Sequence, residues 1–168
     1  MKVLKFGGTS VADSRSIDKV ISILKSNDEP LFIVVSALSG ITNLLQKCLN
    51  QNGESASDII TEIEQRHLQV ITDMCDYNNQ TSLKKFLRDN LNELDDLLNL
   101  ISETGEVSNE KKSKVLTLGE ILSSNIIYEI LRQKGLDISH IDSRELIFTK
   151  DSNTCLLYTS DAADDKQC

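Results

Sequence analysis

Apolar and polar positions in the first 35 residues follow the pattern of a strand, a helix and a second strand. Residues 1–6 contain a short apolar run that ends at two glycines. In residues 13–26 apolar side chains recur every three or four positions, and Asp13 stands where a helix N-cap is expected. Residues 31–35 are all apolar, which is typical of a strand buried on both faces of a parallel sheet. Together these segments predict a right-handed βαβ unit.

Helical spacing alone continues from about residue 54 to residue 106. Two amphipathic stretches, separated by a predicted turn at residues 76–80, indicate a helical hairpin. We interpret His67, on the apolar face, as a packed or interface histidine rather than a ligand, because Glu64 is the one ligand-type residue at helical spacing from it. The predicted buried positions are Ile59, Ile63, His67, Val70, Met74, Leu83, Leu87, Leu91, Leu94, Leu98 and Ile101.

A further helix is predicted from Ser108, a good N-cap residue, to residue 134. Gly135 follows at the position where a left-handed C-cap is expected. Residues 136–141 have the pattern of a third strand, and residues 142–145 that of a turn.

One face of this helix carries a carboxylate between two hydroxyls, at Thr117, Glu120 and Ser124. A glutamate in such a setting could bind an amine or simply face water, and the spacing alone favours water.

Composition limits the classes of function. The chain has 168 residues, 39% of them hydrophobic and 26% charged, and a formal net charge of -8. This charge argues against a nucleic-acid or anionic-membrane surface, and neither a membrane span nor a signal peptide is indicated, so we expect a cytoplasmic protein. Neither a zinc site nor a disulfide framework is expected from the spacing of Cys48, Cys75, Cys155, Cys168, His67 and His140.

Two polar loops follow the two predicted strands. The first, Lys5-Phe6-Gly7-Gly8-Thr9-Ser10, could hold a phosphate with its amides, hydroxyls and lysine, if the glycines adopt positive φ angles; it could also be only a tight connection. The second, residues 36–43, is rich in small and hydroxyl residues, which could bind a ligand or only cap and turn the chain. Because parallel strands end at one edge of a sheet, both loops should face one crevice.

Four motifs occur in order along the chain. They are Lys5-Phe6-Gly7-Gly8-Thr9-Ser10-Val11, Val34-Val35-Ser36-Ala37 with Ser39-Gly40-Ile41-Thr42-Asn43, Leu118-Gly119-Glu120-Ile121-Leu122-Ser123, and Asp142-Ser143-Arg144. Together they resemble the amino-terminal part of aspartate kinases, and the chain is most similar to the type that is fused to homoserine dehydrogenase. The similarity extends over roughly the first 150 residues.

The resemblance implies the amino-acid-kinase fold, an α/β three-layer αβα sandwich on a mostly parallel sheet, present here in part and with an inserted helical hairpin. It implies transfer of the ATP γ-phosphoryl group to the β-carboxylate of L-aspartate with Mg²⁺, in a parent enzyme that forms homo-oligomers. A Walker-type phosphate loop is absent from the sequence.

The resemblance also assigns roles to residues. Lys5 would contact the transferring phosphoryl group as the catalytic cation, with Gly7, Gly8, Thr9 and Ser10 completing the phosphate site. The substrate-binding residues would be Ser36, Thr42 and a buried Glu120, whose carboxylate would accept the α-ammonium of aspartate; Arg144 is left unassigned.

The family pattern continues in a second half that supplies nucleotide-binding loops, and that half is not in this sequence. We expect residues 1–153 to be the amino-terminal part of the kinase domain, inactive on its own. Residues 154–168 resemble the in-frame translation of a sequencing adapter, so we expect a read-through tail; a genuine acidic tail is the alternative.

Two other functions stay open. A kinase of the same fold could act on glutamate or carbamate, because the phosphate loop would serve any of these substrates. A non-catalytic interaction module could instead use the long helical hairpin, although this would leave Lys5, the glycine pair and Glu120 without a purpose.

Overall fold

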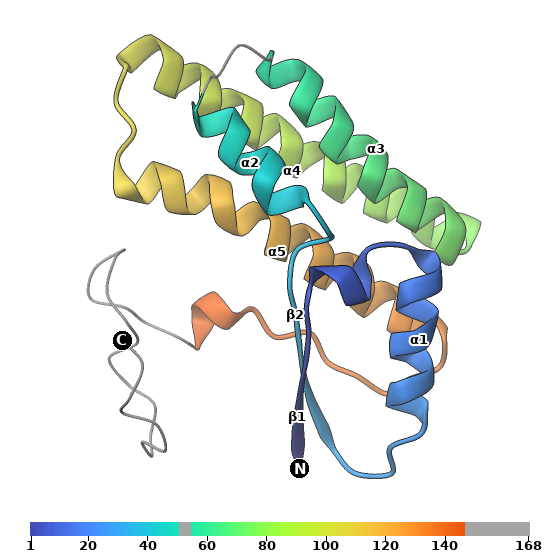
Figure 1. Cartoon of the computed structure of the whole chain (residues 1–168). Coiled ribbons are helices and arrows are strands. Elements are labelled where there is room, and N and C mark those ends of the chain that lie inside the picture. The colour runs from blue at the N-terminus through green and yellow to red at the C-terminus, as the bar shows by residue number, and fades with distance from the viewer. Residues whose placement is uncertain (51–54, 147–168) are drawn as a thin grey trace, which may run out of the picture.

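The amino-terminal part of the chain is a βαβ unit (Figure 1). The structure is a computed structural model and describes residues 1–50 and 55–146. Strands β1 (Lys2–Phe6) and β2 (Leu31–Val35) pair in parallel, and helix α1 (Ser14–Lys25) connects them. The Asp13 carboxylate caps α1 by accepting a 2.8 Å hydrogen bond from the Ser16 amide. The predicted strand, helix, strand order is confirmed.

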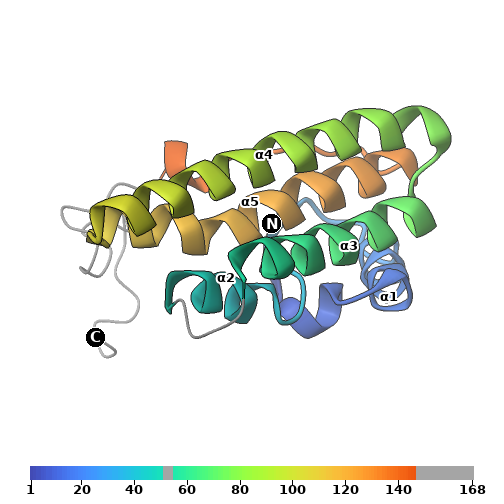
Figure 2. The ribbon, with the colours of Figure 1, turned by 90° about the horizontal axis from the view of Figure 1, so that it is seen from above.

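Four further helices gather beyond the carboxyl ends of the two strands (Figure 1). They are α2 (Ile41–Asn50), α3 (Ala56–Met74), α4 (Tyr77–Thr104) and α5 (Asn109–Gln133). Seen from above, α3, α4 and α5 run side by side, and α2 lies next to α3 (Figure 2). In the described part of the chain, no helix combines the length and the apolar character needed to cross a membrane.

Helices α3 and α4 form the predicted hairpin. Every residue predicted to face its interior is buried, including His67, which is 0% exposed. The connection is shorter than predicted: Asp76 is the N-cap of α4 and accepts a 3.0 Å hydrogen bond from the Asn79 amide. A capping aspartate and a turn aspartate have the same local sequence signature, which explains the difference.

Helix α5 begins and ends close to its predicted limits. The Ser108 hydroxyl accepts a hydrogen bond from the Lys111 amide at 3.2 Å, and Gly135 has a φ of 81°. The predicted third strand is wrong: residues 136–142 contain no strand, and a 3₁₀ turn follows at Ser143–Glu145. Leu136 and Ile138 pack against the core through their side chains. Among the described residues, β1 and β2 pair only with each other. The apolar pattern of residues 136–141 therefore reflects side-chain packing and not hydrogen bonding in a sheet.

The sheet is covered on one face only. Leu4, Phe6, Ile33 and Val35 pack toward the core, whereas Val3, Phe32 and Val34 are 65%, 41% and 39% exposed. The prediction that residues 31–35 are buried on both faces is therefore wrong for this chain, because no described element covers the second face.

Two sequence predictions lie outside the described residues. The read-through tail at 154–168 falls wholly within the undescribed carboxyl end, and so does the domain boundary at residue 153.

Candidate functional site

The loop after β1 makes a tighter turn than predicted. Gly7 has a φ of -71°, and a 3₁₀ helix, η1 (Gly8–Val11), precedes α1. Neither Gly7 nor Gly8 has the positive φ that would open this loop for a phosphate. The Ser10 amide donates a 2.9 Å hydrogen bond to the Gly7 carbonyl oxygen, so this amide closes the turn instead of pointing at a ligand. Lys5 and Thr9 are exposed.

Gly8 is needed for contact between the two loops. A Cβ atom on Gly8 would lie 3.0 Å from the Ala37 carbonyl oxygen, closer than such atoms normally approach. One residue earlier in the second loop, the Ser36 amide donates a 3.1 Å hydrogen bond to the Phe6 carbonyl oxygen. The two loops are therefore adjacent, in agreement with their predicted meeting at one edge of the sheet.

Helix α5 holds the second loop from the other side. The buried Ser123 hydroxyl donates a 2.8 Å hydrogen bond to the Ser36 carbonyl oxygen. Gly119, one turn earlier, lets the helix approach closely, because a Cβ atom there would lie 2.8 Å from the Ala37 Cβ atom and 3.2 Å from Ile41 Cγ2. The sequence motif around Glu120 thus lies against the loop that contains Ser36.

The substrate-binding residues assigned by resemblance lie in this loop, at its junction with α2, and on α5. Ser36 is half-buried, Thr42 is exposed in the first turn of α2, and Glu120 is exposed on α5. Among the described residues no hydrogen bond or ion pair joins these side chains to each other or to Lys5. The resemblance implied a buried Glu120, and this is wrong for the chain, because no described element covers that face of α5. The exposed position agrees with the helical spacing of Glu120, which favoured a side chain facing water.

The Asp142-Ser143-Arg144 motif forms a local ion pair. The Arg144 Nε atom donates hydrogen bonds to both Asp142 carboxylate oxygens, at 2.9 and 3.0 Å. These hydrogen bonds, together with one from the Arg144 amide, lower the pKa of Asp142 to about 2. The pair stabilises the turn at Ser143–Glu145 and leaves Arg144 without an assigned role in the site.

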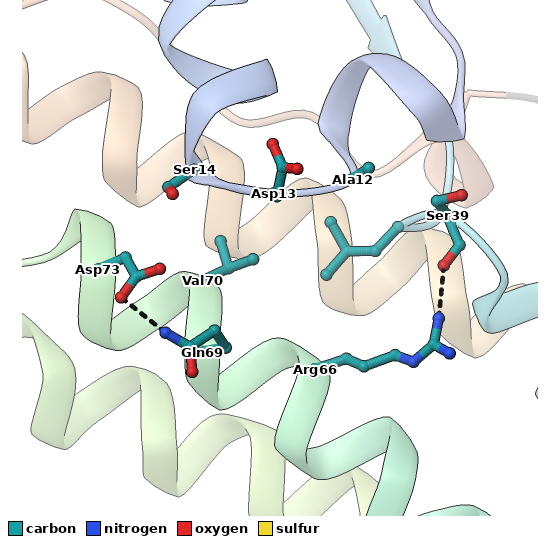
Figure 3. Close-up of a pocket in the computed structure, with 9 residues that line it drawn as sticks. Ala12, Asp13, Ser14, Ser39, Arg66, Gln69, Val70 and Asp73 are labelled. Atoms are coloured by element: carbon teal, nitrogen blue, oxygen red, sulfur yellow. Dashed lines mark hydrogen bonds between the residues drawn. The ribbon is translucent and has the colours of Figure 1, made fainter.

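A pocket of about 350 Å³ lies on the α3 side of the second loop (Figure 3). The Arg66 side chain extends from α3 toward Ser39, and its guanidinium donates a 3.1 Å hydrogen bond from Nη1 to the Ser39 carbonyl oxygen. Sequence reasoning missed Arg66, because its position on the polar face of α3 resembles that of any solvated arginine. The residues that line the pocket are Ala12, Asp13, Ser14, Leu38, Ser39, Arg66, Gln69, Val70 and Asp73.

Metal-ligating groups are dispersed over the described residues. Within residues 1–50 and 55–146 no three His, Cys, Asp or Glu side chains come together so that they could hold a metal ion.

The model of the amino acid kinase family matches residues 1–165 of the chain. The chain belongs to this family. The resemblance to aspartate kinases is also confirmed by curated members of the amino acid kinase family. An aspartokinase of Chlamydia muridarum is 29% identical over 147 residues, which are 88% of this chain and 31% of that protein. A chloroplastic bifunctional aspartokinase/homoserine dehydrogenase of Arabidopsis thaliana is 28% identical over 150 residues, covering 86% of this chain and 16% of that protein.

Solved amino acid kinases share the fold. Aspartokinase III of E. coli, in complex with aspartate and ADP, aligns with a TM-score of 0.77 at 23% identity over 88% of this chain and 32% of its own. Aspartate kinase of Clostridium acetobutylicum aligns with a TM-score of 0.57 at 26% identity, over 78% of this chain and 29% of its own. The predicted fold class is confirmed, and the chain spans less than a third of the length of these structures.

Proposed function

We propose that this chain is the amino-terminal part of an aspartate kinase, which transfers the γ-phosphoryl group of ATP to the β-carboxylate of L-aspartate. The relatives named above support the proposal, and so does the placement of the four sequence motifs. The 168-residue chain alone would be inactive. We further propose a homo-oligomeric parent enzyme in the cytoplasm, with fusion to homoserine dehydrogenase as one possible arrangement.

The observation that carries the proposal is the position of Ser36 between the two other parts of the site. Its amide is bound to the Phe6 carbonyl oxygen, beside Lys5, and its carbonyl oxygen is bound to Ser123, one turn from Glu120. A phosphoryl donor at Lys5 and an amino-acid acceptor at Ser36 would then be neighbours. Phosphoryl transfer depends mainly on such positioning and on stabilisation of charge.

In this reaction an oxygen of the aspartate β-carboxylate attacks the γ-phosphorus of ATP. The bond from that phosphorus to the bridging oxygen breaks, ADP leaves with the electron pair, and aspartyl β-phosphate is formed. The exposed ammonium group of Lys5 would contact the transferring phosphoryl group and offset its negative charge. Gly7, Gly8, Thr9 and Ser10 would border the phosphates, and Mg²⁺ would arrive bound to ATP.

Recognition of the acceptor would fall to Ser36, Thr42 and Glu120. The two hydroxyls would bind aspartate by hydrogen bonds, and the Glu120 carboxylate would accept the α-ammonium group. An acceptor without that amine would leave the carboxylate unpaired, which gives the site selectivity.

Hydroxylamine trapping tests the proposal, because hydroxylamine converts an acyl phosphate into a hydroxamate, which forms a coloured complex with added ferric ions. In the full-length enzyme we expect ATP-dependent formation of hydroxamate from aspartate. The Lys5→Ala variant should lose this activity. The Lys2→Ala variant should retain it, because Lys2 is an exposed lysine of the same strand that pairs with Glu29. Equal activity in the two variants would refute the role of Lys5.

The substrate assignment is tested by Glu120→Ala, with Glu93→Ala on the exposed side of α4 as its control. We expect Glu120→Ala alone to raise the KM for aspartate. Faster turnover of glutamate or carbamate than of aspartate would favour another kinase of the same fold. Specific binding of another protein by the hairpin, with no kinase activity on any of these substrates, would favour the interaction module.

A further inference from the structure

We propose that Arg66 is a positioning residue for the acceptor site, acting through the loop that joins β2 to α2. This inference rests on the proposed function. Arg66 belongs to the helical hairpin, 27 positions from Ser39 in sequence, yet its Nη1 atom lies 3.1 Å from the Ser39 carbonyl oxygen (Figure 3). On its other side, Nη2 donates a 2.6 Å hydrogen bond to the Glu62 carboxylate, which holds the guanidinium in place. A planar group bound at two of its nitrogens keeps a defined orientation.

The direction of the Ser39 carbonyl group determines the direction of the next peptide amide in the loop. The peptide bond between Ser39 and Gly40 is planar, so holding the Ser39 oxygen on the Arg66 side directs the Gly40 amide to the opposite side. Gly40 directly precedes α2, and its carbonyl oxygen accepts a 3.1 Å hydrogen bond from the Leu44 amide. Arg66 therefore fixes the direction in which α2 starts, and Thr42 lies in the first turn.

Gly40 is adapted to this contact in two ways. Its φ of +80° is unfavourable for other residues, and a Cβ atom there would lie 2.9 Å from Arg66 Nη1. A side chain at position 40 would thus displace the guanidinium from the Ser39 oxygen. The glycine is needed for the turn and also for the approach of Arg66.

The loop is held at both ends by different helices. Ser123 of α5 binds the Ser36 carbonyl oxygen at one end, and Arg66 of α3 binds the Ser39 carbonyl oxygen at the other. Of the residues assigned to the acceptor, Ser36 lies at the first of these hydrogen bonds, and Thr42 lies three residues beyond the second. Loss of the Arg66 contact should release the Thr42 end while the Ser36 end stays fixed.

Steady-state kinetics of the full-length enzyme test this role. We expect Arg66→Ala to raise the KM for aspartate by about fivefold or more, with the KM for ATP and kcat changed by less than about twofold, because only acceptor positioning is disturbed. Arg66→Lys, which keeps one donor, should recover part of the loss. The matched control is Arg88→Ala, an exposed arginine of α4, which should leave both KM values unchanged.

Hydrogen exchange on the same proteins separates this inference from the proposed function. We expect amides 38–41 to exchange roughly three to ten times faster in Arg66→Ala, while amides on the β1 side keep their rates. An unchanged KM for aspartate, an equal rise in both KM values, or unchanged exchange at 38–41 would each overturn the proposal. If the enzyme does not phosphorylate aspartate at all, the proposed function and the acceptor role fail together, and the exchange rates alone decide whether Arg66 fixes the loop.

Discussion

Val3 lies directly opposite Phe32 in the parallel ladder, and both side chains are exposed, at 65% and 41%. Val34, two residues further along β2, extends the same apolar surface. Contiguous apolar surface beside a short sheet with unpaired edges favours association between chains. We therefore expect the isolated 168-residue chain to aggregate or to be loosely packed.

Replacing these three residues tests that expectation. The Val3→Thr/Phe32→Thr/Val34→Thr variant keeps β propensity while removing the apolar surface, so it should stay monomeric at concentrations where the original chain scatters light. Sedimentation velocity measures the difference. Ile23→Gln/Leu100→Gln, which removes isolated exposed apolar side chains from helices, is the control. Equal aggregation of all three proteins would show that the sheet face is not the cause.

The Ser123 hydrogen bond should make a measurable contribution to stability. Ser123→Ala removes the donor to the Ser36 carbonyl oxygen in a buried setting, so we expect the free energy of unfolding to fall by about 1–2 kcal/mol. Urea unfolding of the more soluble triple-threonine variant is the measurement. Ser22→Ala is the control, because Ser22 is exposed and its hydroxyl donates to the Asp18 carbonyl oxygen of its own helix. A loss of the same size in Ser22→Ala would contradict the role of Ser123.

Gly119 should resist substitution even though glycine is unfavourable inside a helix. Gly119→Ala places a Cβ atom 2.8 Å from the Ala37 Cβ atom, so we expect a loss of about 1–3 kcal/mol in the free energy of unfolding, despite the better helix propensity of alanine. Adding Ala37→Gly removes the nearest clash and should restore part of the loss. Additive losses in the double variant would show that the two positions do not compete for space.

The buried histidine predicts a specific loss of stability in mild acid. Burial lowers the pKa of His67 from 6.5 to about 4, and the Nδ1–H group donates to the Ile63 carbonyl oxygen at 2.7 Å. The Nε2 atom has no hydrogen-bond partner among the described residues. Below pH 6.5 the unfolded chain therefore binds a proton that the folded chain does not. The stability should fall as the pH decreases from 6.5 to 4, by about 3 kcal/mol from this group.

His67→Leu isolates that contribution from those of the carboxylates. Relative to the unmodified side chain, the leucine variant should gain stability steadily between pH 6.5 and pH 4, measured by urea unfolding at several pH values. Gln65→Leu, at an exposed position of the same helix, should show no such gain. A constant difference between His67→Leu and its parent across this pH range would contradict the neutral buried histidine.

The parts of the fold that depend on local signals could be predicted from the sequence. The caps at Asp13 and Ser108 and the buried face of the hairpin follow from hydrogen bonding and periodicity within each element. Residues 136–142 could not be predicted, because a strand requires a partner that the local pattern does not specify. The apolar run at 31–35 likewise predicted a strand buried on both faces of the sheet. That prediction was wrong, because burial of the second face depends on other elements of the fold, which the local pattern does not specify.

Sequence motifs assign Lys5, Ser36 and Glu120 to the candidate site by resemblance. The contacts of Arg66 and Ser123 with the second loop could not be predicted, because they join segments far apart in sequence. A signal was present at Gly119, since an isolated glycine within a helical pattern often marks a close approach of backbones. Nothing in the sequence around Arg66 distinguishes it from a solvated arginine.

The separation of 87 positions between Ser123 and Ser36 has a consequence for the order of folding. The hairpin of α3 and α4 is built from contacts that are close in sequence, so it can form early, whereas the contact of α5 with the second loop requires closure of a long segment. We expect pulse-labelling hydrogen exchange during refolding to protect the hairpin amides first and those of residues 36–41 last. The second loop would then gain its final shape only after all the helices around it have docked.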